Sequence, residues 1–492
     1  MKGGGFLSNV TQYPNLKDTL ENPLFSKSDD SLRAKIKDHL KQTKHKLIVL
    51  DDDPTGVQTV HDIFVITDWR KDWIKKGLSD ERSVLYILTN TRSYNAEKTE
   101  NINREIVQNI VEVTREMGIS FSIISRSDST LRGHYPLEID VLQDELLKAA
   151  KSQISGHLIV PAFFEAHRYT LDNTHYLGVD LQLVPVSETE FANDSVFGFK
   201  TANLPKWIEE KTNGRVASES SLIISLEDIH NGGIDKVYEI LLSARNNTPI
   251  IVNAKSYYDL DIVSLAVLKA IDSGKQFLFR TAASFVKSIA GIYDRPYLSA
   301  DEIVSKDESR KNGGFIVVGS HTKKTTEQIN ELIKKYPIEQ IEINVVKVLN
   351  EKTRAEELTR VCQLVDYNIS SNRDTLVFTS RDVIIAKDIE ENLKISQTVS
   401  GSLVEVVRSL KVKPKFIIAK GGITSSDVAT EGLKIKYAKI LGQAIAGVPV
   451  WLTGSEAKFK DTPYIVFPGN VGEKESIAQI FENIKNDQKG EI

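Results

Sequence analysis

The chain has 492 residues, of which 40% are hydrophobic and 26% charged, and a formal net charge of −4. A chain of this length exceeds one small core and predicts two domains. The near balance of charge argues against a nucleic-acid partner, and no apolar run approaches the roughly 18 residues of a membrane span. The single cysteine, Cys362, excludes an intramolecular disulfide and a thiolate zinc cluster and favours a reducing, cytoplasmic location.

Residues 1–45 are predicted to form a peripheral arm that ends in a basic helical stretch. Beyond it, short apolar runs alternate with helix-like segments such as 103–118 and 327–337. The runs are apolar on both alternations, which is typical of strands in a parallel sheet that is covered on both faces. They occupy residues 47–50, 84–88, 121–125, 157–160, 222–225, 249–252, 276–279, 315–318, 375–378, 415–419 and 464–467.

This alternation predicts an α/β fold with two domains, each a mostly parallel sheet flanked by helices. A charged segment that carries Pro296 and ends in Gly313 and Gly314 predicts the domain boundary within 286–312. The predicted organisation is therefore an arm at 1–45, a first domain at 46–290 and a second domain at 312–492.

Polar and glycine-rich stretches follow the predicted strands directly: DDDPTG, TNTRS, RSDSTLRG, GSHTKKT, KGGITS and PGNVG. In α/β sheets, ligands bind at the carboxyl ends of the strands. A purely structural chain would scatter such groups more evenly along its length. The clustering therefore favours an enzyme.

The stretch LIVLDDDPTG places three carboxylates side by side at the end of a predicted strand. The aspartates could simply open a turn, but adjacent like charges favour a site that handles a metal, a proton or a hydroxyl. The pattern D-x-D-x-T also fits a Mg²⁺-dependent phosphatase, with Asp51 as nucleophile and Asp53 as acid/base. Because no later strand ends in the acidic pair that such enzymes use, this interpretation is kept as an alternative.

The stretch SRSDSTLRGHYPLEID is the second dense group of reactive side chains. Arg126 and Arg132 can hold a carboxylate in bidentate fashion, and Asp128 can accept a hydroxyl proton. Gly133 allows the backbone to approach a ligand closely. The alternative is that these residues only cap the helix predicted to carry Leu137 to Leu147.

Three glycine-containing stretches in the second half predict an anion site. In KGGITSSD, the backbone N–H groups at Gly421 and Gly422 can point at a phosphate, and Thr424 with Asp427 fits a capping box. The strand ends at GSHTKKT and PGNVG offer similar turns, and together they suggest the phosphates of a nucleotide. Lys420 could contact phosphate or be solvated.

Five motifs occur in order: D-D-x-T-G at 52–56, D-S-T-L-R-G at 128–133, G-S-x-x-x-x-T at 319–325, G-G-x-T at 421–424 and G-N-x-G at 469–472. In these motifs the chain resembles the four-carbon acid sugar kinases over nearly its whole length after residue 45. It departs from their pattern at Arg126, where a lysine is usual, and in His-Tyr-Pro after the second motif.

The resemblance implies that the first domain binds an acid sugar and the second binds ATP, with the active site in the interdomain cleft. The implied reaction is ATP-dependent phosphorylation of a hydroxyl on a tetronate or 3-oxo-tetronate, with Mg²⁺ bridging the phosphates through ligands that we do not place. The implied nucleotide-binding residues are Gly319, Ser320, Thr325, Gly421, Gly422, Ile423, Thr424, Gly469, Asn470 and Gly472.

A mechanism follows from this resemblance as a hypothesis. Arg126 and Arg132, helped by Arg92, would hold the carboxylate of the acid. Asp52 and Asp53 would bind its hydroxyls, and Asp128 or Asp53 would take the proton late in phosphoryl transfer.

The expected partners are the acid sugar and ATP, without nucleic acid or membrane, and a homodimer is left open. Besides the phosphatase, a non-catalytic sensor that binds a sugar acid and a nucleotide remains an alternative. The particular acid and the hydroxyl that is phosphorylated are also open.

Overall fold

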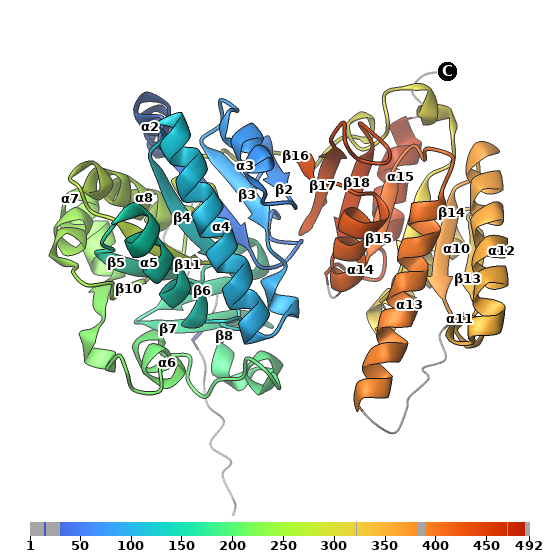
Figure 1. Ribbon diagram of the computed structural model, residues 1–492. Helices are drawn as coiled ribbons and strands as arrows, with labels where there is room; N and C mark the ends of the chain where they lie inside the picture. Colours follow the sequence, from blue (N-terminus) through green and yellow to red (C-terminus); the bar gives the residue numbers. More distant parts are fainter. Residues whose placement is uncertain (1–13, 16–29, 321, 381–388, 470, 488–492) are drawn as a thin grey trace, which may run out of the picture. The chain divides into compact units, whose positions relative to one another are not determined.

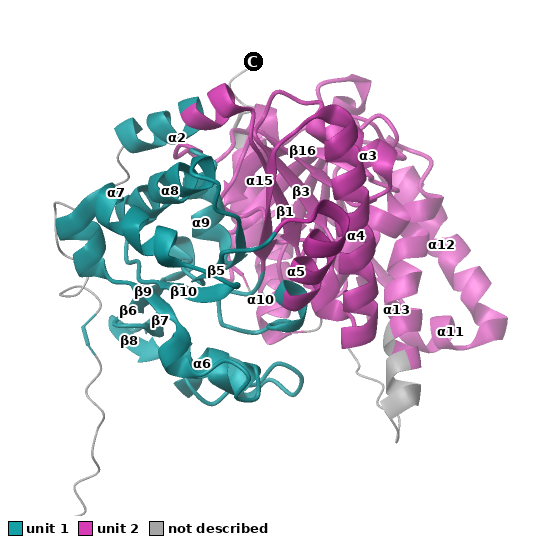
Figure 2. Ribbon diagram, turned by 60° about the vertical axis from the view of Figure 1, so that its left-hand side comes forward, with its two compact units in different colours: residues 1–38, 127–139, 153–291 teal, residues 39–126, 140–152, 292–492 magenta. Residues whose placement is uncertain are grey.

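The computed structural model describes residues 14–15, 30–320, 322–380, 389–469 and 471–487. The chain divides into two compact units, coloured separately in Figure 2. Unit 1 comprises 1–38, 127–139 and 153–291, and unit 2 comprises 39–126, 140–152 and 292–492. The last passage from unit 1 to unit 2 falls inside the predicted boundary of 286–312. However, unit 2 also takes in two segments that lie within the predicted first domain.

Unit 2 is built on a long, mostly parallel sheet (Figure 1). Its strands occur in the spatial order β13-β14-β12-β15-β18-β17-β16-β2-β3-β1-β4. Their bounds are β1 (Lys46–Asp51), β2 (Ile63–Ile66), β3 (Val84–Leu88), β4 (Phe121–Arg126), β12 (Phe315–Val318), β13 (Glu339–Ile343), β14 (Thr375–Thr379), β15 (Ile417–Lys420), β16 (Tyr437–Ile445), β17 (Val448–Thr453) and β18 (Pro463–Phe467).

The antiparallel part of this sheet was not predicted. β16 pairs antiparallel with both β2 and β17, and β17 pairs antiparallel with β18, while the flanking pairs are parallel. Along β16, buried and partly exposed residues alternate, which is the pattern of a strand with one buried face. A search for runs that are apolar on both alternations misses such a strand.

The helices of unit 2 lie along the sheet (Figure 1). They are α3 (Lys71–Leu78), α4 (Ala96–Met117), α10 (Lys323–Lys335), α11 (Val345–Leu349), α12 (Glu351–Ser370), α13 (Ile389–Ser409), α14 (Gly422–Asp427) and α15 (Ser476–Asp487), and a π-helical turn, η8 (Val428–Gly432), extends α14. Helix α2 (Asp30–Thr43) and helix α5 (Leu137–Ala150) each begin in unit 1 and end in unit 2.

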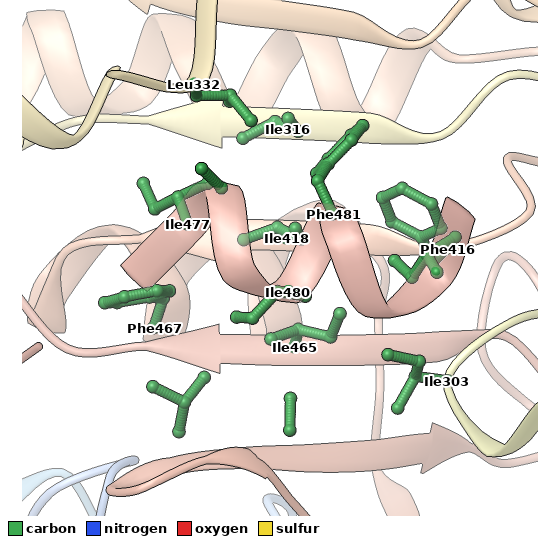
Figure 3. Packing of buried hydrophobic residues seen from close by; sticks show 14 of the residues in the cluster. Ile303, Ile316, Leu332, Phe416, Ile418, Ile465, Phe467, Ile477, Ile480 and Phe481 are labelled. Carbon is green, nitrogen blue, oxygen red and sulfur yellow. The ribbon is translucent and has the colours of Figure 1, made fainter. Parts of the chain in front are cut away.

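A cluster of buried hydrophobic residues joins α15 to the strands of unit 2. Figure 3 shows Ile477, Ile480 and Phe481 of α15 among residues of β12, β15 and β18 such as Ile316 and Ile465. Each of these side chains is at most 1% exposed. The burial of this apolar area stabilises the ends of three neighbouring parallel strands, where the glycine-containing turns begin.

Unit 1 contains a parallel sheet with the order β11-β5-β10-β9 and a separate antiparallel sheet, β6-β7-β8. The strands are β5 (Gly156–Val160), β6 (Arg168–Leu171), β7 (Thr174–Val179), β8 (Gln182–Pro185), β9 (Leu222–Ile224), β10 (Thr248–Val252) and β11 (Phe277–Thr281). The helices are α6 (Leu204–Lys211), α7 (Leu226–Ser243), α8 (Tyr257–Asp272) and α9 (Ala283–Ile289).

The helix of the predicted arm is packed. Arg33 of α2 is fully buried in unit 1, and its Nε donates to Asp261 at 3.2 Å. Ser288 donates to the other oxygen of Asp261. A buried ion pair of this kind fixes the helix in place, because separating the charges would leave one of them uncompensated.

The predicted fold class is confirmed: the chain has two α/β domains with a mostly parallel sheet flanked by helices. Every apolar run that was predicted as a strand is one, within a few residues at each end. In the part of the chain that the structure describes, each helix is too short or too polar to cross a membrane.

Candidate functional site

The loop that follows β1, here called the aspartate loop (51–56), holds its carboxylates in three different environments. Asp51 is 1% exposed and Asp52 is 3% exposed, whereas the Asp53 side chain is 24% exposed. Thr55 donates to Asp53 Oδ1 through both its backbone N–H, at 2.8 Å, and its hydroxyl. Of the three aspartates, Asp53 is therefore the one that a ligand can reach most readily.

Two arginines neutralise this loop. Arg92 donates to both oxygens of Asp52 and, from Nη1 at 3.2 Å, to Asp53. Arg126, at the end of β4, lies with Nη1 3.5 Å from Asp51 Oδ1 and is almost fully buried. Its Nε has no hydrogen-bond partner among the described residues. The predicted site residues Asp52, Asp53, Arg92 and Arg126 therefore lie close together, with both arginines engaged by aspartates.

Burial raises the pKa of Asp51 to about 8, although the charge of Arg126 opposes this shift. Burial also raises the pKa of Asp53, but the charge of Arg92 and the hydrogen bonds from Thr55 outweigh it, so the net pKa of Asp53 lies below its ordinary value. Near neutral pH, Asp53 is thus a charged acceptor, while Asp51 is mostly protonated.

The packing around Asp51 bears on the phosphatase alternative. A Cβ placed on Gly56 would lie 2.0 Å from both carboxylate oxygens of Asp51, so the backbone of the loop covers this carboxylate. A nucleophile has to reach the phosphorus atom of its substrate. The covered position of Asp51 disfavours this role.

The residues around Asp128 form a second cluster, which lies in unit 1. Arg132 Nε donates to Asp128 Oδ2 at 2.7 Å, and Thr130 donates to the same oxygen. Arg132 also lies 3.5 Å from Asp194, and its guanidinium stacks over the Phe191 ring. Because α5 begins only at Leu137, the interpretation of this stretch as a helix cap is wrong.

Two residues of the antiparallel sheet in unit 1 extend this cluster. Arg168, at the start of β6, has a buried Nε without a hydrogen-bond partner among the described residues, and burial lowers its pKa. His175 is fully buried and hydrogen-bonds to the Ser129 carbonyl at 2.7 Å, and burial lowers its pKa to about 3. His175 is therefore a neutral structural support for the loop that carries Asp128.

The glycine-containing turns of unit 2 come together at the carboxyl ends of β12, β15 and β18. A Cβ on Gly319 would lie 2.0 Å from Thr424 Oγ1, and one on Gly469 would lie 3.7 Å from Ser320 Oγ and 3.9 Å from the Gly421 Cα. We call Gly319, Ser320, Gly421, Gly422, Thr424 and Gly469 the glycine cradle. A side chain does not fit at Gly319 without a shift of Thr424. The N–H groups of Gly319 and Gly421 donate to the carbonyls of Lys420 and Phe467, so the predicted role of the Gly421 N–H in anion binding is wrong, and of the two predicted donors the Gly422 N–H remains.

Several predicted nucleotide residues have other roles or positions. Thr325 is buried and donates to Ser320 Oγ at 2.9 Å, so it orients the cradle. Ile423 is 64% exposed, and Gly472 packs against Ser476 and Gln328. Asn470 lies outside the described residues.

The predicted capping box at Thr424 is wrong. Helix α14 begins at Gly422, with Gly421 at the N-cap position and a φ of 124°. Asp427 instead accepts a hydrogen bond from Ser400 at 3.2 Å.

A pocket of about 950 Å³ opens beside the cradle within unit 2, a size typical of small-molecule sites. Gly319 and Thr424 of the cradle belong to its wall, and most of the remainder is apolar or small. The stretch TNTRS after β3, which contains Thr89 and Asn90, was singled out from the sequence, but the contributions from α13 and from the end of β2 were not predicted. The small pair Ser400–Gly401 in α13, a helix of mixed polar and apolar residues, was an available signal. The residues that α13 and the chain after β2 and β3 contribute to the pocket wall include Thr67, Trp69, Thr89, Asn90, Ser400, Gly401, Leu403 and Val404.

The described residues do not form a ready metal site. They contain no group of three or more His, Cys, Asp or Glu side chains arranged to hold an ion. In the aspartate loop, the carboxylates already face Arg92 and Arg126. The donor set therefore does not fit a Mg²⁺ ion held by protein side chains alone.

Comparison with known proteins identifies two domains in the chain. A family model described as a sugar-binding N-terminal domain matches residues 47–289, and one described as a nucleotide-binding C-terminal domain matches residues 315–477. Both descriptions agree with the division of roles that the motifs implied. None of the curated proteins matches the chain.

Two solved structures share the fold. One, from Salmonella typhimurium LT2 and provisionally named a tRNA synthase, has a TM-score of 0.66 and 16% identity, with 90% of this chain and 99% of that chain covered. The other, a Haemophilus influenzae protein of the family DUF1537, has a TM-score of 0.61 and 18% identity, with 89% and 99% covered. With both of its domains matched, the chain belongs to the family that joins a sugar-binding N-terminal domain to a nucleotide-binding C-terminal domain, the architecture of the four-carbon acid sugar kinases.

Proposed function

We propose that the protein is an ATP-dependent kinase that phosphorylates a hydroxyl of a four-carbon acid sugar, a tetronate or 3-oxo-tetronate. The observation that carries this proposal is the glycine cradle, in which turns from three neighbouring strands meet beside a pocket of about 950 Å³. A triphosphate needs many N–H donors around it, and a nucleoside needs an adjacent pocket of this size.

The nucleotide would place its phosphates on the cradle and its nucleoside in the adjoining pocket. Gly422 supports this assignment, because a Cβ there would meet nothing within 4 Å. The N–H groups at Gly422 and Ile423 open α14 and therefore lack intrahelical acceptors. Thr424 and Ser320 add hydroxyl donors around the same space.

The acid sugar would be recognised by carboxylates that accept from its hydroxyls and by arginines that bind its own carboxylate. Asp53 in unit 2 and Asp128 in unit 1 are the two candidates for the base. Each is held by an arginine, Arg92 for Asp53 and Arg132 for Asp128. An arginine partner keeps a carboxylate ionised, so that it can orient an attacking hydroxyl and take its proton late in the transfer.

Magnesium is implied by the resemblance, and when bound to ATP it neutralises charge on the phosphates. Since the described carboxylates do not form a site for it, we route no step through the metal ion. The chain's own contribution is to hold the phosphates on backbone N–H groups, to orient the acceptor hydroxyl with Asp53 or Asp128, and to bind the substrate carboxylate with Arg132.

The test is an assay of ADP release with purified protein, ATP and a panel of four-carbon acids and their 3-oxo forms. The proposal expects ADP release that depends on the added acid. Asp128→Asn and Asp53→Asn should each be assayed, and loss of the base should lower turnover by about 100- to 10,000-fold. Nucleotide affinity should remain near the wild-type value in both variants.

The same assay separates the alternatives. Acid and nucleotide binding without ADP release would favour the sensor. Release of phosphate from phosphorylated acids without ATP, together with a beryllofluoride adduct on Asp51, would favour the phosphatase. Equal loss of nucleotide binding in Asp128→Asn and Gly422→Val would contradict the division of roles proposed here.

A further inference from the structure

Lys420 is a fully buried cation at the end of β15, directly before the glycine cradle. Its Nζ donates to the Pro468 carbonyl at 2.6 Å and to the Gly469 carbonyl at 3.2 Å. The ammonium also lies 4.1 Å from the centre of the Phe467 ring. Lys420 is therefore neither a solvated surface residue nor a side chain extended toward a ligand. It fastens the turn after β18 to the end of β15.

A second buried lysine provides a direct contrast. Lys415, just before β15, lies 2.8 Å from Asp374. For Lys420, no carboxylate lies within ion-pair distance among the residues that the structure describes. The charged group that faces Lys420 from a neighbouring element is another cation, Lys324 of α10.

Burial without a counter-ion makes the protonated form of a lysine less stable relative to the neutral form. Burial and the nearby charge of Lys324 lower the pKa of Lys420 to about 7. The protonated and neutral forms of Lys420 are thus closely balanced near neutral pH. Gly469, which Lys420 holds, adjoins Ser320 and Gly421, so the missing negative charge would arrive with any anion on the cradle.

We propose, resting on the proposed nucleotide site, that Lys420 positions the Pro468–Gly469 turn and takes up a proton when a nucleotide polyphosphate binds to the glycine cradle. The proton passes from the buffer to Nζ of the neutral fraction, and no covalent bond of the nucleotide changes. The polyphosphate supplies a counter-charge that the described residues around Lys420 do not provide, so it favours the ammonium form. Lys420 is a positioning residue in this scheme.

The sign of the resulting pH dependence follows from linkage. Because binding takes up a proton, nucleotide affinity is greatest where Lys420 is already protonated and falls as pH rises above about 7. The decrease can reach about tenfold per pH unit at most, for one proton per nucleotide.

The experiment is calorimetric titration of the full-length protein with ADP in buffers of different ionisation enthalpy, at about pH 8, where the phosphates of ADP are ionised. The slope of the observed enthalpy against the buffer ionisation enthalpy gives the number of protons taken up. Lys420→Arg keeps a permanent cation that can donate to the same carbonyls. Lys415→Met is the matched control, because it removes the buried lysine that already has a carboxylate partner.

We expect proton uptake in the wild-type protein and in Lys415→Met, and none in Lys420→Arg. Binding without proton uptake by the wild-type protein, or equal uptake by Lys420→Arg, would overturn the inference while leaving the proposed function intact. Failure of the wild-type protein to bind ADP would overturn both. If Lys420→Arg does not fold, the pH dependence of ADP affinity in the wild-type protein tests the inference. An affinity that stays constant above about pH 7 would contradict proton linkage.

Discussion

The aspartate loop and the glycine cradle both follow buried parallel strands of unit 2, yet they are built in opposite ways. The aspartate loop carries three adjacent carboxyl groups and two arginines that face them. The cradle carries backbone groups and small hydroxyls, and the buried cation Lys420 donates to carbonyl groups beside it. Buried charged groups, which lower stability unless they are paired, dominate the first region. The second region depends on the close approach of chain segments. Four changes test this contrast.

Arg92→Met should produce the largest effect, because it leaves the buried Asp52 and the neighbouring Asp53 without their common partner. We expect a loss of about 3–5 kcal/mol in the free energy of unfolding, measured by urea denaturation. Arg82→Met is the control: Arg82 pairs with Asp80 nearer the surface, at 2.7 Å, and its loss should cost less than about 1 kcal/mol. Similar losses in the two variants would mean that the aspartate loop is not specially dependent on its arginines.

Gly56→Ala tests the close packing of the loop on Asp51. The added Cβ would lie 2.0 Å from the carboxylate oxygens, so the loop has to shift, at an expected cost of about 1–3 kcal/mol in stability. Gly401→Ala in α13 is the matched control, because a Cβ there meets nothing within 4 Å and alanine favours the helix. A melting temperature for Gly56→Ala equal to that of the wild type would show that the loop accommodates the added methyl group at little energetic cost.

Gly422→Val tests the cradle by filling space rather than by removing charge. Its Cβ enters the open region beside the cradle, so the fold should keep its stability while ADP affinity falls by at least about tenfold, or 1.4 kcal/mol. Calorimetric titration measures the affinity, and thermal unfolding checks the fold. Unchanged affinity would place the phosphates elsewhere.

Asp51→Asn tests how the aspartate loop affects the pH dependence of the free energy of unfolding. Folded Asp51 keeps a proton up to about pH 8, whereas the unfolded chain releases it near the ordinary value of an aspartate. Between these values folding takes up a proton, so this group lowers stability as pH rises, by at most about 1.4 kcal/mol per pH unit. Unfolding free energies at about pH 5.5 and 7.5 should therefore fall more steeply for the wild type than for Asp51→Asn. Parallel slopes would show that Asp51 ionises normally.

The parallel strands and the reactive stretches after them were accessible from sequence for a local reason. A strand that is covered on both faces is apolar at every position, as in LIVL before the aspartate loop, and the pattern needs no knowledge of its neighbours. Strand β16 was missed because only alternate residues are buried there, and which face is buried depends on the strands beside it. The capping box at Thr424 failed because the N-cap residue is Gly421, three residues earlier, and the sequence does not reveal the backbone angle of that glycine.

From sequence alone, the residues around Asp52, Asp128 and Gly421 could be proposed as candidate site residues, because their chemical types and spacing are local properties. The tertiary structure decided how those residues are used. It covered Asp51 with Gly56, paired Arg92 and Arg126 with aspartates, and turned Lys420 onto the carbonyls of a distant turn. The ion pairs and the Lys420 contact join residues 40, 75 and 48 positions apart in the chain, so no local pattern specifies them.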